Sequence, residues 1–393
     1  MFFSCNFFVR VVILVTSAFC IGGCAVRDAS GKTPYVNGNS QMVTEIKSIE
    51  VPGNRIPLQI FSLRPKEGQA ICWDFLTGGE VSGFEPVVFD YVNDRKVCSI
   101  PHGGEYGGCY LSPDGTRILS TCDDPPGSII LRDLAGQRVG IFVGQLEQKT
   151  DIQWFPGGNR FVATSKDLPI YVWEVNEGQP EEADSIEYHG HTRHYPSAVA
   201  ISSDSKRVAS GDWTGYLHVW DPGLGARLRR FPREIDPDFV PPPGLEDDYD
   251  DFCGAGILAV KFLAGNDQIV MVTSIGHVVV VDVRTRVEVS RYHQPAGTAP
   301  EDLVPVHHGV PMAIDVSPDG SRILYSMHTQ PVRLLDTQTG ALIAEFQGHT
   351  RQGYYDLNDK GQPGGVRAVA FTPDGDRAVT AGDDGTIRIW QLP

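Results

Sequence analysis

Six tight turns recur along the chain, and each is flanked by two short runs of β-forming residues. The segments are "LSPDGTRILS" (111–120), "WFPGGNRFVAT" (154–164), "ISSDSKRVAS" (201–210), "FLAGNDQIVMV" (262–272), "VSPDGSRILYS" (316–326) and "FTPDGDRAVTA" (371–381). A Pro/Asp/Gly turn between two such runs is typical of a β-hairpin. Successive turns lie 43, 47, 61, 54 and 55 residues apart. The chain is therefore predicted to be a β-repeat protein.

Each hairpin is followed by two more β-runs. The third run of each repeat has an acidic or amide residue near its end, and the six copies are "IILRDL", "IYVWEV", "YLHVWD", "VVVVDV", "VRLLDT" and "TIRIWQL". A fourth run usually follows, as in "ALIAEF" (341–346). Repeats of about 40 to 50 residues with four antiparallel strands are blades of a β-propeller. A diverged first blade around "IPLQIFSLRPKEGQAICWDF" (56–75) brings the predicted number of blades to seven.

The last repeat ends one strand early. After "TIRIWQL" only Pro393 remains, whereas "QMVTEIKSIEV" (41–51) is a β-pattern that precedes the first blade and has no partner there. Pairing this N-terminal segment with the last blade would close the ring and remove an open sheet edge. The predicted propeller domain therefore spans residues 41–393.

Several motifs resemble those of the WD-repeat family. They are the Gly-His pairs 190–191 and 348–349, "VWE" (172–174), "VWD" (219–221) and "AGDDGTIRIW" (381–390). The resemblance covers residues 42 to 393 and implies a buried network of His, Ser/Thr, Asp and Trp in a blade. The last blade matches all four positions, with His349, Thr380, Asp384 and Trp390.

Blade four matches three positions of that network, with His191, Ser210 and Trp220, while Thr214 stands where the resemblance implies Asp. A buried polar network is tolerated when every member is satisfied, and it then fixes the register of the strands. These seven residues are interpreted as structural, and His349 and Asp384 are not interpreted as a catalytic pair.

The N-terminus has the pattern of an export signal. One basic residue, Arg10, precedes an apolar run from Val11 to Gly23 that is too short to span a bilayer. The end of this run, "IGGC", resembles the lipobox of bacterial lipoproteins and implies that Cys24 carries lipid. We predict a signal peptide over 1–23, a flexible tether over 24–40 and a lipid-anchored protein of the bacterial cell envelope. A signal peptide that releases a soluble protein and an uncleaved anchor are the alternatives.

Charge restricts the class of partner. The formal net charge is −16 and no run of Lys/Arg stands out, so nucleic acid is not an expected ligand. Beyond Cys24 the chain has five cysteines, whose spacing matches neither a disulfide framework nor a zinc site: Cys72, Cys98, Cys109, Cys122 and Cys253. Buried free thiols are the expected state.

Long insertions precede blades five, six and seven, at 233–254, 293–311 and 349–365. Loops of that length are usually functional or disordered. Residues 234–251 contain eight Asp/Glu and no Lys/Arg, and the interpretations are a calcium site, a dock for a basic partner or a solvated acidic loop. The spacing is not that of an EF-hand calcium loop, because "EDDYDD" lacks the glycine and the distal glutamate. Exposed aromatic residues and arginines anchor many interfaces. The candidate partner-binding residues chosen on that basis are Arg193, His194, Tyr195, Trp213, Tyr249, Arg351, Tyr354 and Tyr355.

No local motif of catalysis is present: neither a nucleophile elbow, nor a zinc-protease helix, nor a phosphate-binding loop. We therefore predict a monomeric, non-catalytic scaffold, with no cofactor and no metal, that binds a protein or peptide on the face where the insertions open. One alternative is a propeller of the Tol type that docks an envelope protein. Another is a hydrolase or lyase centred on the channel, because such a site draws single residues from several blades and leaves no motif.

Overall fold

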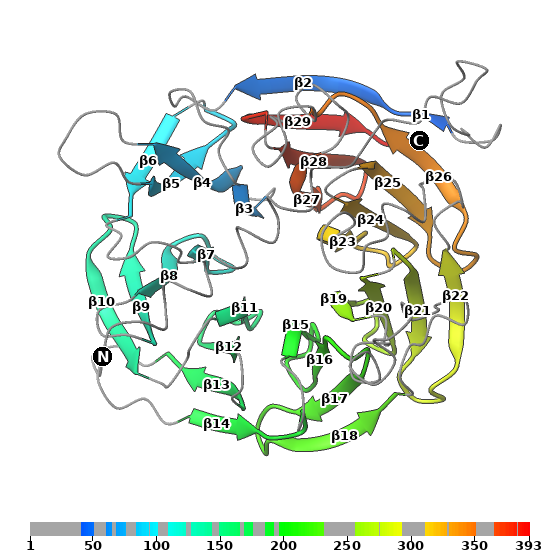
Figure 1. Cartoon of the computed structure of the whole chain (residues 1–393). Coiled ribbons are helices and arrows are strands. Elements are labelled where there is room, and N and C mark those ends of the chain that lie inside the picture. The colour runs from blue at the N-terminus through cyan, green and yellow to red at the C-terminus, as the bar shows by residue number, and fades with distance from the viewer. Residues whose placement is uncertain are drawn as a thin grey trace, which may run out of the picture.

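The structure is a computed structural model, and it describes most of the strands and the tight turns. The described ranges are 41–50, 60–64, 68–75, 84–93, 95–100, 109–122, 127–143, 149–165, 169–175, 185–191, 196–231, 256–274, 276–292, 311–327, 330–350, 365–382 and 384–393. These residues form seven sheets arranged in a ring (Figure 1). The predicted seven-bladed, all-β propeller is confirmed.

The first strand of each blade lies innermost and the last lies outermost (Figure 1). Blade one has β3 (Ile60–Arg64), β4 (Gln69–Phe75), β5 (Phe84–Asp90) and β6 (Arg95–Ser99). Blade two has β7 (Cys109–Leu111), β8 (Arg117–Cys122), β9 (Ser128–Asp133) and β10 (Arg138–Val143). Blade three has β11 (Lys149–Trp154), β12 (Arg160–Ser165), β13 (Ile170–Glu174) and β14 (Ser185–Tyr188).

The later blades repeat this order. Blade four has β15 (Pro196–Ile201), β16 (Val208–Asp212), β17 (Leu217–Asp221) and β18 (Ala226–Arg230). Blade five has β19 (Ile257–Phe262), β20 (Gln268–Thr273), β21 (Val278–Asp282) and β22 (Glu288–Tyr292). Blade six has β23 (Pro311–Val316), β24 (Arg322–Met327), β25 (Gln330–Asp336) and β26 (Leu342–Phe346). Blade seven takes β27 (Val366–Phe371), β28 (Arg377–Gly382) and β29 (Thr386–Gln391) from the C-terminus.

The fourth strand of blade seven comes from the N-terminus. Strand β2 (Thr44–Glu50) pairs antiparallel with β29, from Thr44 opposite Gln391 to Glu50 opposite Thr386 (Figure 1). Ile49 is buried against the core of blades one and seven, and Glu45 forms an ion pair with Arg388. The predicted closure of the ring is confirmed.

The same segment also reaches blade six, which the sequence did not predict. Strand β1 (Gln41–Met42) pairs in parallel with β26, with Gln41 opposite Ala344 and Met42 opposite Glu345. Blade six therefore has five strands, and a single N-terminal segment joins two blades. The outer edge of a blade in this protein can thus accept an additional strand.

The hairpin turns are built from local hydrogen bonds. In blade two the hydroxyl of Ser112 donates to Asp114 and accepts the backbone N–H of Arg117, and Gly115 has a φ of 71°. The same arrangement recurs around Ser202, Ser317 and Thr372. The recurring Ser/Thr and Asp of these turns therefore close the hairpins, with Gly at the position of positive φ in three of them and Ser205 in blade four.

Arginines that follow these turns join neighbouring blades. Arg117 donates from Nη2 to the carbonyl of Gly158 in blade three at 2.8 Å. Arg322 likewise donates to the carbonyl of Gly375 in blade seven at 2.7 Å. The apolar core also lies between blades, since Val87 and Phe89 of blade one cluster with Ala370 and Val379 of blade seven. Blade-to-blade contacts thus hold the ring rigid.

Candidate functional site

The face of interest carries the turns between the second and third strands and the connections between blades. Among the predicted partner-binding residues, Trp213 in the turn after β16 is described and is partly exposed. A Cβ on Gly256, at the start of blade five, would lie 2.9 Å from the backbone oxygen of Trp213. Blade five therefore packs directly against the backbone that carries Trp213. The other members of the set lie outside the described residues: Arg193, His194, Tyr195, Tyr249, Arg351, Tyr354 and Tyr355.

In blade seven the four predicted network residues lie together. The Nδ1 of His349 lies 3.0 Å from a carboxylate oxygen of Asp384, and its Nε2 lies 2.7 Å from the hydroxyl of Thr380. The Nε1–H of Trp390 donates to that hydroxyl at 2.8 Å. Although burial opposes it, the hydrogen bond from His349 keeps the pKa of Asp384 below its ordinary value. All four side chains are thus occupied with one another.

Blade four contains the same network with its carboxylate in another place. The Nδ1 of His191 lies 2.8 Å from Asp212, its Nε2 lies 2.8 Å from Ser210, and Trp220 donates to Ser210 at 3.2 Å. Asp212 comes two residues before Thr214, the position where the resemblance implied Asp. Thr214 instead donates its backbone N–H and its hydroxyl to Asp212. Asp212 was not predicted from the sequence, because the pattern of blade seven places the carboxylate two residues later, at the position of Thr214.

A steric difference accounts for the different positions of the carboxylate in the two blades. A Cβ on Gly382, which corresponds to Asp212, would lie 2.6 Å from Nδ1 of His349. Blade seven therefore has glycine beside the ring and reaches it with Asp384. Despite the burial of Asp212, its hydrogen bond from His191 keeps the pKa of this carboxyl below its ordinary value.

A second histidine lies beneath the network of blade four. The rings of His218 and His191 stack with centroids 4.2 Å apart, and Tyr188 forms a 2.9 Å hydrogen bond with Nδ1 of His218. The Nε2 of His218 is buried without a hydrogen-bond partner among the described residues. Burial, reinforced by the electrostatic contribution of the neighbouring His191, lowers the pKa of His218 to about 3. His218 is therefore a neutral core residue at neutral pH.

The innermost strands carry a small set of charged groups. Asp151 accepts the backbone N–H of Val199 in blade four, and burial raises the pKa of Asp151 to about 6. Asp315 accepts the backbone N–H of Phe371 in blade seven and forms a 2.6 Å ion pair with Lys261. Both carboxylates thus bind the backbone of the following blade.

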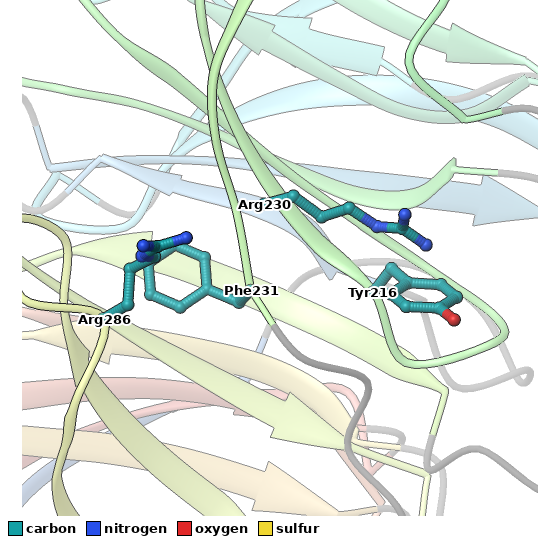
Figure 2. Close-up of a pocket in the computed structure, with 4 residues that line it drawn as sticks. All are labelled: Tyr216, Arg230, Phe231 and Arg286. Atoms are coloured by element: carbon teal, nitrogen blue, oxygen red, sulfur yellow. The ribbon is translucent and has the colours of Figure 1, made fainter.

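A pocket that the sequence analysis did not predict lies between blades four and five. It has a volume of about 380 Å³ and is lined by Tyr216, Arg230, Phe231 and Arg286. Figure 2 shows Arg230 extended over Tyr216, with Arg286 beside Phe231. The guanidinium carbon of Arg230 lies 4.0 Å from the centroid of the Tyr216 ring. The sequence signal for this pocket is the "RLRR" of β18, at 227–230.

The described residues contain no arrangement typical of a metal site or of a membrane span. Within these ranges no three His, Cys, Asp or Glu side chains come together in a way that suits a metal ion. Nor does this part of the chain contain a helix of the length and apolarity that a membrane span requires. Cys98 and Cys109 are free thiols, and burial raises the pKa of Cys109 to about 12. Cys24, Cys253 and the acidic segment 234–251 lie outside the described residues.

Comparisons with known proteins agree with this architecture. The family model "WD domain, G-beta repeat" matches residues 184–221 and 353–391. The first match includes β14 of blade three and β15 to β17 of blade four, and the second includes the C-terminal strands of blade seven. The chain is 22% identical to periodic tryptophan protein 2 of Saccharomyces cerevisiae over 309 residues, which are 78% of this chain and 31% of that protein. It is 35% identical to the small ribosomal subunit protein RACK1 of Caenorhabditis elegans over 75 residues, which are 18% of this chain and 23% of that protein.

The chain thus spans less than a third of the length of either curated relative. Among solved structures, it is similar to the β-propeller domain of Cps50 (Swd1) from Myceliophteria thermophila. That similarity has a TM-score of 0.63 at 11% identity and covers 89% of this chain and all of that domain. At such low identity the likeness concerns the fold.

Proposed function

We propose that this chain, a seven-bladed propeller with WD repeats in blades four and seven, is a non-catalytic platform that binds a protein or peptide. The observation that carries the proposal is that the buried His-Asp pairs and the carboxylates of the innermost strands are hydrogen-bonded within the fold. The His-Asp pairs of blades four and seven are closed into buried networks with Ser210 or Thr380. The carboxylates of the innermost strands bind backbone N–H groups of neighbouring blades. These groups stiffen a scaffold, and a rigid scaffold favours binding because little order is lost on association.

We place the partner on the face that carries Trp213 and the connections before blades five to seven. Gly256 packs against the backbone of Trp213, and this tryptophan is partly exposed. A rigidly held aromatic side chain is a typical anchor of an interface. The residues chosen from the sequence on the neighbouring connections, such as Tyr195 and Tyr354, would complete this surface.

We further propose that the protein is exported and anchored through lipid on Cys24. The "IGGC" motif and the apolar run before it support this assignment. Residues 25–40 can extend over at most about 55 Å, so the propeller would stay near the membrane surface. Incorporation of radiolabelled palmitate into the parent, and its loss in Cys24→Ser, is the expected result. Labelling that persists in the variant would refute this anchor.

Affinity capture from the cell's own extract tests the platform. The full chain is compared with a variant in which Trp213, Tyr354 and Tyr355 are changed to alanine, and with Val143→Ala. Val143 is an exposed apolar residue of β10 and serves as the matched control. Proteins retained by the parent and the control but lost by the triple variant support the proposal. Equal capture by all three chains would place the binding surface elsewhere, and no capture by any of them would refute the platform.

A further inference from the structure

The junction between blades four and five differs from the neighbouring junctions at one turn position. The turns between the third and fourth strands of blades four, five and six share one hydrogen bond, from Gly225, Arg286 and Gly340 to the aspartate carbonyl four residues earlier. All three residues have positive φ, at 59°, 62° and 68°. This backbone conformation favours glycine and strains a side-chain-bearing residue. Blade five nevertheless has arginine there.

The arginine requires an open junction. A Cβ on Gly225 would lie 2.3 Å from the carbonyl oxygen of Glu187 in blade three, and one on Gly340 would lie 2.6 Å from that of Arg291 in blade five. At these two junctions the glycine turn packs directly on the last strand of the preceding blade. At the junction of blades four and five, Arg286 instead lines the 380 Å³ pocket.

The strand on the other side of the pocket is also exceptional. All five residues of β18 are exposed, whereas β22 and β26 alternate with buried residues. Arg229, opposite Val219, corresponds to Ser290, opposite Val280. Ser290 is buried and donates to the carbonyl of Thr337 in the next blade. In blade four, Arg229 thus stands where blade five has Ser290, the residue that links blade five to blade six.

This surface is basic on an acidic protein. Arg227, Arg229 and Arg230 lie on β18, with Arg286 across the pocket, and none of the four has a carboxylate partner among the described residues. The formal charge of the whole chain is −16. Apolar groups accompany the arginines, since Leu224, Leu228 and Val287 are 76%, 42% and 60% exposed. A mixture of arginines and apolar side chains is suited to an acidic peptide rather than to a free ion.

The backbone of β18 offers the means of holding such a peptide. Within the described part of the chain β18 pairs only with β17, so its outer edge is open. In blade six the corresponding outer edge of β26 is already paired with β1. Extended peptides bind open sheet edges through backbone hydrogen bonds, and their side chains give the specificity.

We propose that an extended acidic segment of a partner protein adds as a strand to β18 and places a carboxylate between Arg230 and Arg286. The buried Phe231 forms the floor of the pocket, and the ring of Tyr216 holds the guanidinium of Arg230 in place. The site centres on the outer strand β18 and on the turn that carries Arg286, while Tyr216 belongs to the same turn as Trp213. It therefore adjoins the proposed platform face, but recognition of an acidic strand by β18 does not require a partner on that face.

The test uses the full chain and a fluorescein-labelled ten-residue peptide that alternates glutamate and valine, with binding followed by anisotropy. Arg286→Gly introduces the residue of the sister turns, and Arg229→Ser introduces the residue of blade five. Each is expected to weaken binding at least tenfold without lowering the Tm. Arg138→Ser on β10 removes an exposed arginine from another outer strand and should bind like the parent.

Three further peptide and chain variants decide the chemistry. Two altered peptides should each bind at least tenfold more weakly than the original peptide. In one, glutamine replaces every glutamate; in the other, the backbone nitrogens of the glutamates are methylated. Equal binding of the glutamine peptide would overturn acid recognition, and equal binding of the methylated peptide would overturn strand addition. If the parent does not bind the peptide but a variant with the eight carboxylates of 234–251 changed to amides does, that segment of the chain occupies the site and a partner protein is excluded. If neither chain binds the peptide, the proposal is also overturned.

Discussion

Asp212 and Asp384 bind the same ring nitrogen of two equivalent histidines from turn positions that lie two residues apart. Asp212 reaches Nδ1 of His191 at 2.8 Å, and Asp384 reaches Nδ1 of His349 at 3.0 Å. Where Asp212 stands in blade four, blade seven has Gly382, whose added Cβ would collide with the ring. The network therefore needs a carboxylate at Nδ1, and the turn can supply it from either position.

This equivalence predicts a compensating pair of changes in blade four. Asp212→Gly should lower the free energy of unfolding by about 3 kcal/mol, because it leaves a buried imidazole N–H without an acceptor. Adding Thr214→Asp to that variant recreates the turn of blade seven and should recover most of the loss. Urea unfolding of the parent, the single variant and the double variant measures both effects. A double variant no more stable than the single one would contradict the equivalence.

Much of the fold could be predicted because its signals are local. A hairpin turn such as Ser112-Pro113-Asp114-Gly115 contains its own hydrogen bonds, so spacing alone located six blades. Closure by residues 41–51 followed from an unpaired strand at each end of the chain. The pairing of Gln41–Met42 with β26 was not predictable, because two residues carry no periodicity. The pocket was missed because it depends on Arg230 and Arg286, which belong to different blades.

The N-terminal strand should contribute strongly to stability. Deleting residues 41–50 exposes the edge of β29 and removes the buried side chain of Ile49, so a loss of several kcal/mol is expected. Replacing Gln41 and Met42 with Gly and Pro abolishes only the short pairing with β26 and should have a much smaller effect. Thermal unfolding monitored by circular dichroism separates the two. A Tm unaffected by the longer deletion would contradict ring closure by β2.

Asp151 should make the protein less stable as the pH rises. Burial raises its folded pKa to about 6 from an ordinary value of 3.8, so the folded state binds more protons than the unfolded state between these values. Stability contributed by this group is therefore lost as the pH rises, by about 1 kcal/mol between pH 5 and pH 7. Asp151→Asn keeps an acceptor for the N–H of Val199 and should remove this dependence. Urea midpoints of the two chains at pH 5 and pH 7 test it, and parallel changes would exclude Asp151 as the cause.

His218 should act in the opposite direction. Its folded pKa of about 3 lies below the ordinary 6.5, so the unfolded state binds the extra proton and stability falls as the pH decreases from about 6.5 to about 3. The loss should reach about 2 kcal/mol at pH 5. His218→Gln retains an acceptor for the hydroxyl of Tyr188 but cannot titrate, so its stability should depend less on pH below 6.5. A variant that loses as much stability as the parent between pH 7 and pH 5 would show that His218 is not the acid-sensitive group.

Arg286→Gly should stabilise the protein, since it removes a side chain from a backbone conformation with positive φ. The expected gain is about 1 kcal/mol. The matched changes Gly225→Arg and Gly340→Arg should each cost several kcal/mol, because their Cβ atoms would overlap the backbone of Glu187 and Arg291. Urea unfolding of the three variants gives the comparison. A gain in stability together with loss of peptide binding in Arg286→Gly would show that the strained arginine is retained for recognition; a destabilised Arg286→Gly would instead assign that side chain a structural role at the junction.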